Sequence, residues 1–454
     1  MDAYYGVQTL RAIENFAGIS GFQIGMYPNY VKALAMVKWA AAKANHELGL
    51  IPTDVANAIT AACEEIIDGK LHDQFPVDML QGGAGTSTNM NINEVVANRA
   101  LEILGHQKGE YQYCHPNNHV NLSQSTNDAY PTSFHLAILL TNKEVVAEIK
   151  RLVDAFRRKA KEFENVLKMG RTQLQDAVPM TLGQEFEAYA YTLEENIERL
   201  NEAAKLFLVE NMGATAIGTG INSEPEYAEI CARELRIISG EEFVLAPNLI
   251  AATPDTGACV SYSSELKRFC VQLSKICNDL RLLSSGPRCG LREINLPPMQ
   301  PGSSIMPGKV NPVIPEVVNQ VCFRVIGNDT TVMMAAEAGQ LELNVMEPVI
   351  VYTLLNSQNM LVKVMDRLRV LCVDGITANP EHCKELVLNS IGIVTALNPT
   401  LGYENSSRIA KRALQENRSV YDLVLEEGLL TKAELDDLLR PELMIKPKKF
   451  YRKK

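Results

Sequence analysis

Several common devices of enzymes and membrane proteins are missing from this 454-residue sequence. No apolar stretch approaches the roughly 20 residues that a membrane-spanning helix needs, and the start shows no basic segment followed by an apolar run. There is no glycine loop ending in Lys-Ser or Lys-Thr for phosphates, no dinucleotide fingerprint after a strand, and no His-Glu-x-x-His pair for zinc. We therefore expect a cytoplasmic protein without a nucleotide site or a zinc site of these kinds.

The chain contains ten cysteines, but none of them form pairs with the sequence spacing of metal ligands. Several of them, such as Cys270 and Cys277, lie inside helical patterns, which favours buried, reduced thiols over disulfides. Acidic residues outnumber basic ones and give a net charge of -10. This sign argues against nucleic acid or an anionic membrane as a partner. It does not exclude a small anionic substrate, since a local cluster of donors can outweigh a distant net charge.

Helical periodicity is what the sequence has in abundance. In one stretch an apolar residue recurs at three- and four-residue steps, at Leu266, Phe269, Leu273, Ile276, Leu280 and Leu283. This spacing predicts a helix packed lengthwise in a bundle. Residues 131–167, 182–212 and 314–370 show comparable patterns, the last with Gly327 and Pro348 as expected kinks or breaks. Strand-like alternation is rare, so we predict a mostly α protein with a central long-helix bundle. The pattern leaves open whether the helices pair within the chain or between subunits.

Four short segments rich in Gly, Ser, Thr and Asn interrupt the helices. They are GGAGTSTNMNINE (82–94), SQSTNDAYPT (123–132), MGRTQLQDAVPM (169–180) and QPGSSIMPGKVNP (300–312). Each segment alone is more often a turn or a helix cap than a site. Their hydroxyls, amides and main-chain N–H groups are, however, neutral donors suited to holding carboxylates. The shared chemistry of four segments favours a common role in binding a carboxylate.

The last of these segments carries a specific motif. GSSIMPGKVNP resembles the signature of the aspartase/fumarase superfamily, and the resemblance extends over essentially the whole chain. GRTQLQDAVPMTLGQEF and GATAIGTGIN resemble the aspartases more closely than the fumarases. The resemblance implies the mostly α, three-domain lyase fold of this family. The expected domains are an N-terminal helical domain over 1–126, a central long-helix domain over 127–382 with a catalytic loop at 300–312, and a small C-terminal helical domain over 383–454.

The family resemblance also implies an assembly and an activity. Members of the family are homotetramers whose central helices form a twenty-helix core, and each active site collects loops from three subunits. The implied reaction is the reversible deamination of L-aspartate to fumarate and ammonia, by anti β-elimination through an aci-carboxylate. It requires no cofactor. Some members respond to divalent metal ions, so activation by such ions is a further expectation, although the sequence shows no ligand cluster for them.

Within the 300–312 segment, the resemblance makes Ser303 the general base, acting as an alkoxide. A serine hydroxyl is normally too weakly acidic for this role, and without the resemblance Ser303 reads as a turn cap. A closing loop that excludes water and surrounds the oxygen with N–H groups lowers the cost of deprotonation. Gly302 and Gly308 permit the unusual backbone angles of such a loop. Lys309 and Asn311 match the residues that hold the α-carboxylate.

The other binding residues that the resemblance implies come mostly from the remaining segments. Those for the β-carboxylate and its aci form are Thr86, Ser125 and Thr126, with Ser304 as a further hydroxyl. Those near the amino group and the carboxylates are Asn127 and Thr172. Outside the resemblance, each of them reads as a turn or cap residue.

Position 173 differs from the family pattern. The fumarases and some aspartases place a histidine at this position, and the glutamate that pairs with it matches Glu316, whereas this chain has Gln173. Glutamine does not titrate near neutral pH, so a His-Glu proton relay is not possible and hydration of fumarate becomes less favoured. Gln173 can still hydrogen-bond the substrate. Two alternatives stay open: another lyase of the family, including a fumarase, and a non-catalytic structural protein, because lyase relatives also serve as lens crystallins.

Overall fold

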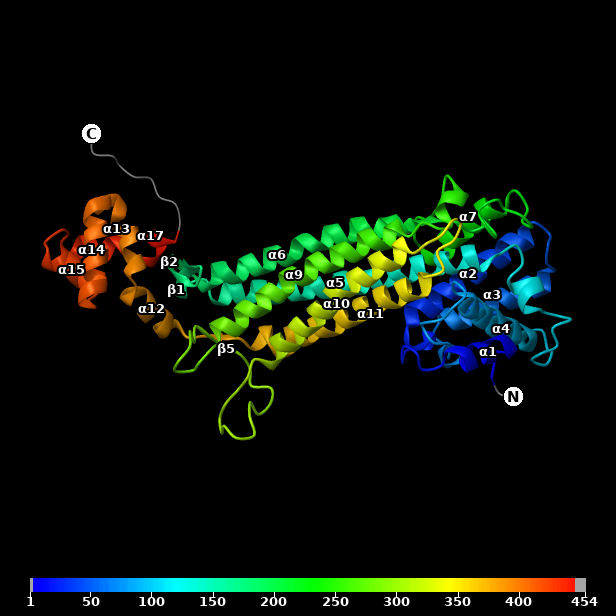
Figure 1. Ribbon diagram of the computed structural model, residues 1–454, viewed down its shortest axis with the longest axis horizontal. Helices are drawn as coiled ribbons and strands as arrows, with labels where there is room; N and C mark the ends of the chain where they lie inside the picture. The colour runs from blue at the N-terminus through cyan, green and yellow to red at the C-terminus, as the bar shows by residue number, and fades with distance from the viewer. Residues whose placement is uncertain (1–2, 446–454) are drawn as a thin grey trace. The chain divides into compact units, whose positions relative to one another are not determined.

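The computed structural model describes residues 3–445, without the side chains of residues 441 and 442. Helices dominate it and the strands are short (Figure 1), which confirms the predicted mostly α class. The chain divides into two compact units. The first comprises Met1–Ala147, Asn196–Val271 and Val321–Lys363, and the second comprises Glu148–Glu195, Gln272–Gln320 and Val364–Lys454. The predicted three-domain boundaries stay a prediction, and residues 446–454 of the expected C-terminal domain lie outside the described part.

Five long helices contribute residues to both units. They are α5 (Thr126–Glu162), α6 (Leu182–Ala204), α9 (Gly257–Leu283), α10 (Val313–Glu337) and α11 (Glu347–Leu371). The six apolar residues of the α9 pattern are each at most 4% exposed, which confirms the predicted lengthwise packing. The predicted helix over 314–370 is two helices. The break lies between Glu337 and Glu347, just before Pro348, whereas α10 continues through Gly327.

Polar side chains tie the long helices to one another inside each unit. In the first unit, the hydroxyl of Tyr262 on α9 donates to Asn142 on α5 and accepts from the amide of Gln358 on α11, both at 2.8 Å. In the second unit, the amide of Asn319 on α10 donates to the hydroxyl of Ser274 on α9 at 2.8 Å. Because these groups are buried, an unmade bond would leave a polar atom without a partner. The bonds therefore specify which helices pair.

The first unit also contains the N-terminal helices. Its remaining elements are α1 (Val7–Phe16), η1 (Ile24–Met26), α2 (Pro28–Glu47), α3 (Thr53–Ile67), η2 (His72–Gln74), α4 (Thr86–Ile103), the π-turn η3 (Pro116–Val120), η4 (Lys205–Leu208), β3 (Val209–Glu210), α7 (Tyr227–Ser239), β4 (Val244–Leu245) and α8 (Leu249–Ala252). The two-residue strands β3 and β4 pair in parallel. The polar segments 82–94 and 123–132 lie at the starts of α4 and α5.

The second unit contains the hairpin of β1 (Leu167–Thr172) and β2 (Gln175–Thr181) and the antiparallel pair of β5 (Ile294–Asn295) and β6 (Thr377–Ala378). Its other elements are η5 (Val373–Gly375), α12 (Pro380–Asn389), η6 (Ile391–Ile393), α13 (Val394–Leu401), α14 (Tyr403–Glu416), α15 (Val420–Glu426), α16 (Lys432–Leu438) and α17 (Pro441–Met444). The C-terminal helices enclose an apolar cluster of their own around Leu397, Ile409 and Leu423.

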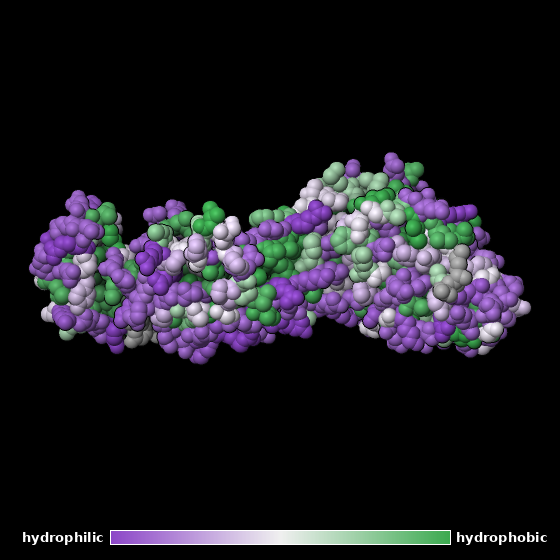
Figure 2. Space-filling view, turned by 90° about the horizontal axis from the view of Figure 1, so that it is seen from below, coloured by the Kyte–Doolittle hydropathy of each residue, from purple (hydrophilic) through white to green (hydrophobic). Residues whose placement is uncertain are grey.

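Hydrophobic side chains also remain on the surface of the long helices. Figure 2 shows them in green among hydrophilic residues on one face of the molecule. On α10 the largest are Phe323, Met333 and Met334, which are 61%, 54% and 64% exposed. No disulfide links the ten cysteines, all of which lie within residues 3–445, and nine of them are buried while Cys289 is exposed, in line with the expected reduced thiols. Among residues 3–445, no helix combines the length and apolar character needed to cross a membrane.

Candidate active site

The start of α5 carries three of the predicted site residues. The main-chain N–H of Asn127 donates to Ser125 Oγ at 3.1 Å, and the N–H of Ser125 donates to Asp128 Oδ1 at 3.0 Å. This reciprocal pairing is a variant of the capping box, so the sequence Ser-Thr-Asn-Asp begins the helix. Because Ser125 Oγ accepts, its hydroxyl hydrogen is left for a ligand. The N-terminus of this 37-residue helix also favours a bound anion.

A second loop, residues 211–216, is fastened to this turn. The Asn127 side-chain amide donates to the carbonyl of Ala216 at 2.8 Å, and the N–H of Thr215 donates to Asp128 Oδ2 at 2.8 Å. Burial raises the pKa of Asp128 to about 7, against the opposing effect of the N–H groups of Thr215, Ser125 and Ala129. The bond to Ala216 leaves Asn127 Oδ1 for a ligand, and this oxygen can only accept. It is therefore suited to an amino group.

The first turn of α4 meets the first turns of α5. Gly85 precedes α4 with a φ of 88°, and a Cβ at this position would lie 2.4 Å from the ring of Tyr130 on α5. Only glycine tolerates both this angle and this approach. One turn into α4, the Asn89 side-chain amide donates to Thr126 Oγ1 at 3.2 Å. Thr86, the first residue of α4, is exposed there, and its hydroxyl donates to the carbonyl of Gly83 at 2.7 Å.

In the second unit, Thr172 ends β1 and the residues Gln173 and Leu174 form the two-residue turn into β2. Their φ angles are 55° and 60°, in the left-handed region that Asn and Gly usually occupy in such turns. Residues held there cost on the order of 1–3 kcal/mol each, and such strain clusters at functional sites. The turn presents Thr172 and Gln173 as exposed side chains.

Buried ion pairs fasten this hairpin to the segment that leads into the 300–312 loop. Glu293 is fully buried just before β5, and it accepts from Arg171 at 2.7 Å and pairs with Lys168 at 3.1 Å. Lys168 also pairs with Glu185 at 2.7 Å. Two cations and two carboxylates thus balance within a largely buried site, which is the condition under which buried charges are tolerated.

The 300–312 segment forms a loop that is closed at its base. The N–H of Gly302 donates to the carbonyl of Lys309 at 2.8 Å, and the side-chain amide of Asn311 donates to the carbonyl of Gly302 at 2.8 Å. A Cβ on Gly302 would lie 2.3 Å from the Lys309 carbonyl oxygen, so this closure requires glycine. Inside the loop, Ser303 is half-buried and its Oγ accepts from the N–H of Ile305 at 3.2 Å.

A cleft of about 660 Å³ lies beside this loop. Lys309 and Asn311 line it from the loop, and Arg281 and Ser284 line it from the end of α9 and the residue that follows. Two cations and several neutral donors make the cleft suitable for an anion. Ser304 and Lys309 are exposed side chains of the same loop.

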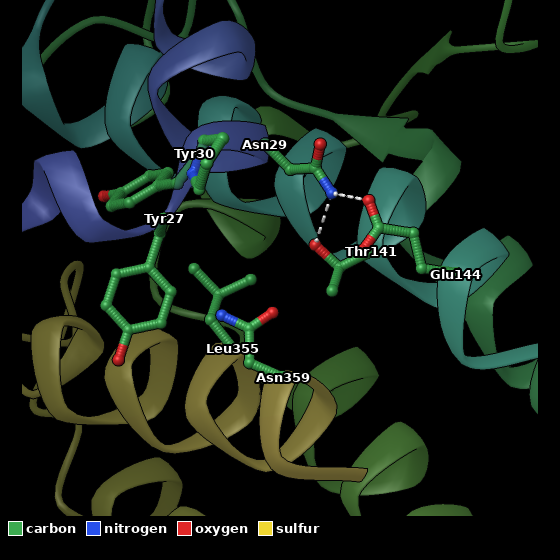
Figure 3. Close-up of a pocket in the computed structure, with 8 residues that line it drawn as sticks. Tyr27, Asn29, Tyr30, Thr141, Glu144, Leu355 and Asn359 are labelled. Atoms are coloured by element: carbon green, nitrogen blue, oxygen red, sulfur yellow. Dashed lines mark hydrogen bonds between the residues drawn. The ribbon is translucent and has the colours of Figure 1, made fainter. Parts of the chain in front are cut away.

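A smaller hollow of about 90 Å³ in the first unit does not share this chemistry. Figure 3 shows Asn29 between Thr141 and Glu144, to which its amide donates at 3.2 Å and 2.8 Å, with Tyr27 and Asn359 on the other side. The charged group that lines it is a carboxylate, which would repel an anionic ligand. None of the predicted site residues lies there.

The predicted site residues therefore fall into two groups. The first unit holds Thr86, Ser125, Thr126 and Asn127, and the second unit holds Thr172, Gln173, Ser303, Ser304, Lys309 and Asn311. Sequence reasoning missed the residues that support the first group. They are Asn89 and Asp128, Lys38, which donates to Asn89 Oδ1 at 2.7 Å, and Asn211, which donates to the Asn127 carbonyl at 3.1 Å. Asp128 stands inside the capping sequence and could have been found by that signal. In the described part of the chain, residues 3–445, no three His, Cys, Asp or Glu side chains are grouped so that they could hold a metal ion.

Known protein families and curated proteins are similar to this chain over nearly its whole length. The family model described as Lyase matches residues 1–327, and the model described as Fumarase C C-terminus matches residues 393–446. An aspartate ammonia-lyase from Helicobacter pylori is 60% identical over 453 residues, which cover 100% of this chain and 97% of that protein. An aspartate ammonia-lyase from Pseudomonas aeruginosa is 61% identical over 448 residues, which cover 98% and 94%.

Solved structures are similar to this chain as well. The crystal structure of a fumarate lyase:delta crystallin from Brucella melitensis bound to cobalt superposes with a TM-score of 0.95 at 56% identity, over 98% of this chain and 97% of that chain. The family match covers well over half of the sequence, and the relatives are similar over nearly all of it. The chain therefore belongs to the aspartase/fumarase superfamily and is an enzyme of the lyase family.

Proposed function

We propose that this enzyme deaminates L-aspartate reversibly to fumarate and ammonia. The observation that carries the proposal is the meeting of the first turns of α4 and α5, which gathers the hydroxyls of Thr86, Ser125 and Thr126 at two helix N-termini. Neutral donors at helix N-termini suit a carboxylate. The relatives from Helicobacter pylori and Pseudomonas aeruginosa are named aspartate ammonia-lyases, which supports aspartate as the dicarboxylate.

The reaction begins with removal of a proton from Cβ of aspartate. Ser303, as an alkoxide, takes this proton, and the electrons of the C–H bond move into the β-carboxylate, which becomes a dianionic aci-carboxylate. The electrons then form the Cα=Cβ double bond as the C–N bond breaks on the opposite face, and ammonia leaves. The N–H of Ile305, which donates to Ser303 Oγ at 3.2 Å, favours the alkoxide. Ser303 finally returns its proton to solvent.

The aci-carboxylate explains why so many donors are needed. Enzymes generally lower reaction barriers by roughly 8–23 kcal/mol, and one donor to a developing oxyanion contributes about 2.7–4 kcal/mol. A single loop is therefore insufficient. The hydroxyls of Ser125 and Thr126, with Ser304 as a further hydroxyl, donate to the β-carboxylate. Thr86 joins them when its hydroxyl turns from the Gly83 carbonyl to the substrate. These bonds strengthen as the charge of the carboxylate grows.

The other substrate groups have matching partners. Lys309 supplies the charge for the α-carboxylate. Asn311 has two amide hydrogens, of which one is bound to the Gly302 carbonyl and the other is left for the same carboxylate. Asn127 Oδ1 and Thr172 accept from the amino group. Gln173 hydrogen-bonds the substrate without titrating, so the site lacks the histidine relay that would activate water for hydration.

We propose a homotetramer with a twenty-helix core, in which three subunits share each active site. The exposed apolar side chains of α10, Phe323, Met333 and Met334, support this, because a second copy of the same helix surface would bury them. Loops from different subunits would then bring the two groups of site residues to one substrate. The reaction requires no cofactor, and a divalent metal ion would serve only as an activator.

The test is an assay of the purified enzyme with L-aspartate, in which fumarate is followed by ultraviolet absorbance and ammonia by a coupled reaction. Both products should appear together in equal amounts, and fumarate with ammonia should give aspartate. 3-Methylaspartate, argininosuccinate and malate serve as competing substrates. If aspartate yields neither product, the proposal is wrong. If malate yields fumarate faster than aspartate does, the enzyme is a fumarase.

A further inference from the structure

A lysine that the proposed reaction does not use lies buried beneath the first turns of α4 and α5. Lys38 is in the middle of α2, within the sequence AMVKWAAAK, and is 1% exposed. Burial of an ammonium is very unfavourable unless it is paired and hydrogen-bonded. Burial lowers the pKa of Lys38 to about 7, and the nearby carboxylate of Asp128 opposes this effect. The hydrogen bonds of this ammonium must therefore explain why it is buried.

The ammonium of Lys38 donates to three side-chain amides. Its Nζ lies 2.7 Å from Asn89 Oδ1, 2.8 Å from Gln124 Oε1 and 3.0 Å from Asn121 Oδ1. Three oxygens can all accept from Nζ only when it carries three hydrogens, so they favour the ammonium form, which has no lone pair and can only donate. Each of the three amides must consequently turn its oxygen toward Lys38 and its NH2 group away. Lys38 thus sets the orientation of all three.

The orientation of Asn89 in turn sets the direction of the hydrogen bond at Thr126. With its oxygen on Lys38, Asn89 donates through Nδ2 to Thr126 Oγ1 at 3.2 Å and to Asn121 Oδ1 at 3.0 Å. Thr126 Oγ1 is then an acceptor toward the protein, and its hydroxyl hydrogen is left for a ligand. If Lys38 were absent, the Asn89 amide could turn over, and its oxygen would take that hydrogen instead.

We propose that Lys38 is a positioning residue for the β-carboxylate, acting through Asn89 to keep the Thr126 hydroxyl a hydrogen-bond donor. This inference rests on the proposed function. The bond that this hydroxyl donates strengthens as negative charge grows on the carboxylate. The effect is therefore greater on the dianionic aci-carboxylate than on bound aspartate, and interactions that strengthen in the transition state act on kcat. Loss of Lys38 should lower kcat more than it raises KM.

The test compares Lys38→Met, Thr126→Val and the double variant in the full-length enzyme. Methionine fills the same space without charge or donors. Each single change should lower kcat/KM for aspartate about 100-fold, as removal of one oxyanion donor does. Because Lys38 acts through Thr126, the kcat/KM of the double variant should stay within about twofold of that of the less active single variant. Wild-type kcat/KM in Lys38→Met, or losses that multiply in the double variant, would overturn the inference.

A control variant and a replacement variant separate a loss of positioning from a loss of folding. Trp39→Phe is the matched control, because Trp39 neighbours Lys38 on α2 but donates to Glu64 on α3, at 3.1 Å; it should lower the melting temperature and leave kcat and KM unchanged. If circular dichroism shows that Lys38→Met does not fold, Asn89→Ala replaces it, since it cuts the connection and leaves Lys38 two amide oxygens. If the losses of kcat/KM from Asn89→Ala and Thr126→Val multiplied in their double variant, the inference would again be overturned. An inactive wild-type enzyme would defeat the proposed function, and this inference with it.

Discussion

The side-chain amide of Asn211 donates to the main-chain carbonyl of Asn127 at 3.1 Å, across 84 residues of sequence. In an uninterrupted α-helix this carbonyl accepts from the N–H four residues later. Pro131 occupies that position in α5 and has no N–H. Asn211 therefore replaces the missing donor, and a remote loop holds the turn that carries Ser125, Thr126 and Asn127.

Asn211→Ala should destabilise this turn. Asn211 is 4% exposed, and its loss leaves the Asn127 carbonyl without a donor. A buried polar group without a partner costs about 1–3 kcal/mol, so the free energy of unfolding in urea should fall by that amount. The kcat/KM for aspartate should fall as well, because Asn127 and its neighbours lose their support.

Adding Pro131→Ala to Asn211→Ala provides the control. Alanine supplies the N–H that proline lacks, and the Asn127 carbonyl can then accept within the helix. The gain in unfolding free energy from Pro131→Ala should be larger in the Asn211→Ala background than in the wild type, where the carbonyl is already bonded. Equal gains in both backgrounds would show that Asn211 is not the replacement donor.

Glu293→Gln should be strongly destabilising, because it leaves the buried cation of Lys168 and the largely buried cation of Arg171 with one carboxylate, Glu185, between them. Removing one member of a buried ion pair costs about 3–5 kcal/mol. Arg171→Met together with Glu293→Gln removes a cation and an anion and keeps the pair of Lys168 and Glu185. The double variant should therefore unfold at a higher urea concentration than Glu293→Gln alone.

An exposed ion pair in the second unit serves as the reference for the buried ion pairs of Glu293. Arg158 and Asp374 pair at 2.7 Å with side chains that are 60% and 36% exposed. Exposed ion pairs contribute about 0–1 kcal/mol, so Arg158→Met should change the unfolding free energy by less than Glu293→Gln does. A similar loss in the two variants would contradict the importance of burial at Glu293.

The sequence supported the fold better than it supported the site. Helix periodicity depends on local spacing, so the pattern from Leu266 to Leu283 predicted a buried face that the structure contains. The break between α10 and α11 was anticipated at Pro348, because proline fits the first turn of a helix but not its interior. Gly327 produced no break, since glycine only weakens a helix whose packing holds it.

Apart from Asp128, which belongs to a local capping sequence, the supporting residues could not be predicted because their partners are remote. A lysine in a helix usually reads as solvated, and the burial of Lys38 becomes visible only when α4 and the 121–124 segment pack against α2. The turn at Gln173 and Leu174 contains neither Gly nor Asn, so its left-handed angles contradict the usual turn chemistry. Such departures from local rules are expected at functional sites.

The pH dependence of stability should change in Glu210→Gln. Glu210 is 2% exposed, and burial raises its pKa from 4.5 to about 8, against the opposing effect of the Met212 N–H. Between these values the folded state binds more protons than the unfolded state, so the unfolding free energy of the wild type falls as pH rises. Glutamine does not titrate. The stability of Glu210→Gln relative to the wild type should therefore rise from pH 4.5 to pH 8 and then level off.

Denaturation series at several pH values measure this difference. Ser239→Ala is the control, because it removes a hydroxyl at the end of α7 that does not titrate in this range. Its stability should run parallel to that of the wild type across the same range. A parallel profile for Glu210→Gln as well would show that this carboxyl is ionised in the folded protein at neutral pH.

Ser303→Ala tests the base directly. Removal of a general base lowers rates by about 10²–10⁴, so kcat for aspartate should fall by that factor. Binding of fumarate in the absence of ammonium, measured by calorimetry, should persist, because the proposed carboxylate donors lie on other residues. Ser239→Ala, at the end of α7, removes a hydroxyl that donates to the Leu235 carbonyl at 2.6 Å and should leave kcat unchanged.

Gly302→Ala separates the base from the loop that holds it. The added Cβ would lie 2.3 Å from the Lys309 carbonyl oxygen, so the base of the loop must open while the Ser303 hydroxyl remains. Since Lys309 moves with the loop, KM for aspartate should rise together with the fall in kcat, whereas Ser303→Ala should affect kcat alone. Turnover at the wild-type rate in Ser303→Ala, with loss of turnover in Gly302→Ala, would mean that the loop supplies binding and another group takes the proton.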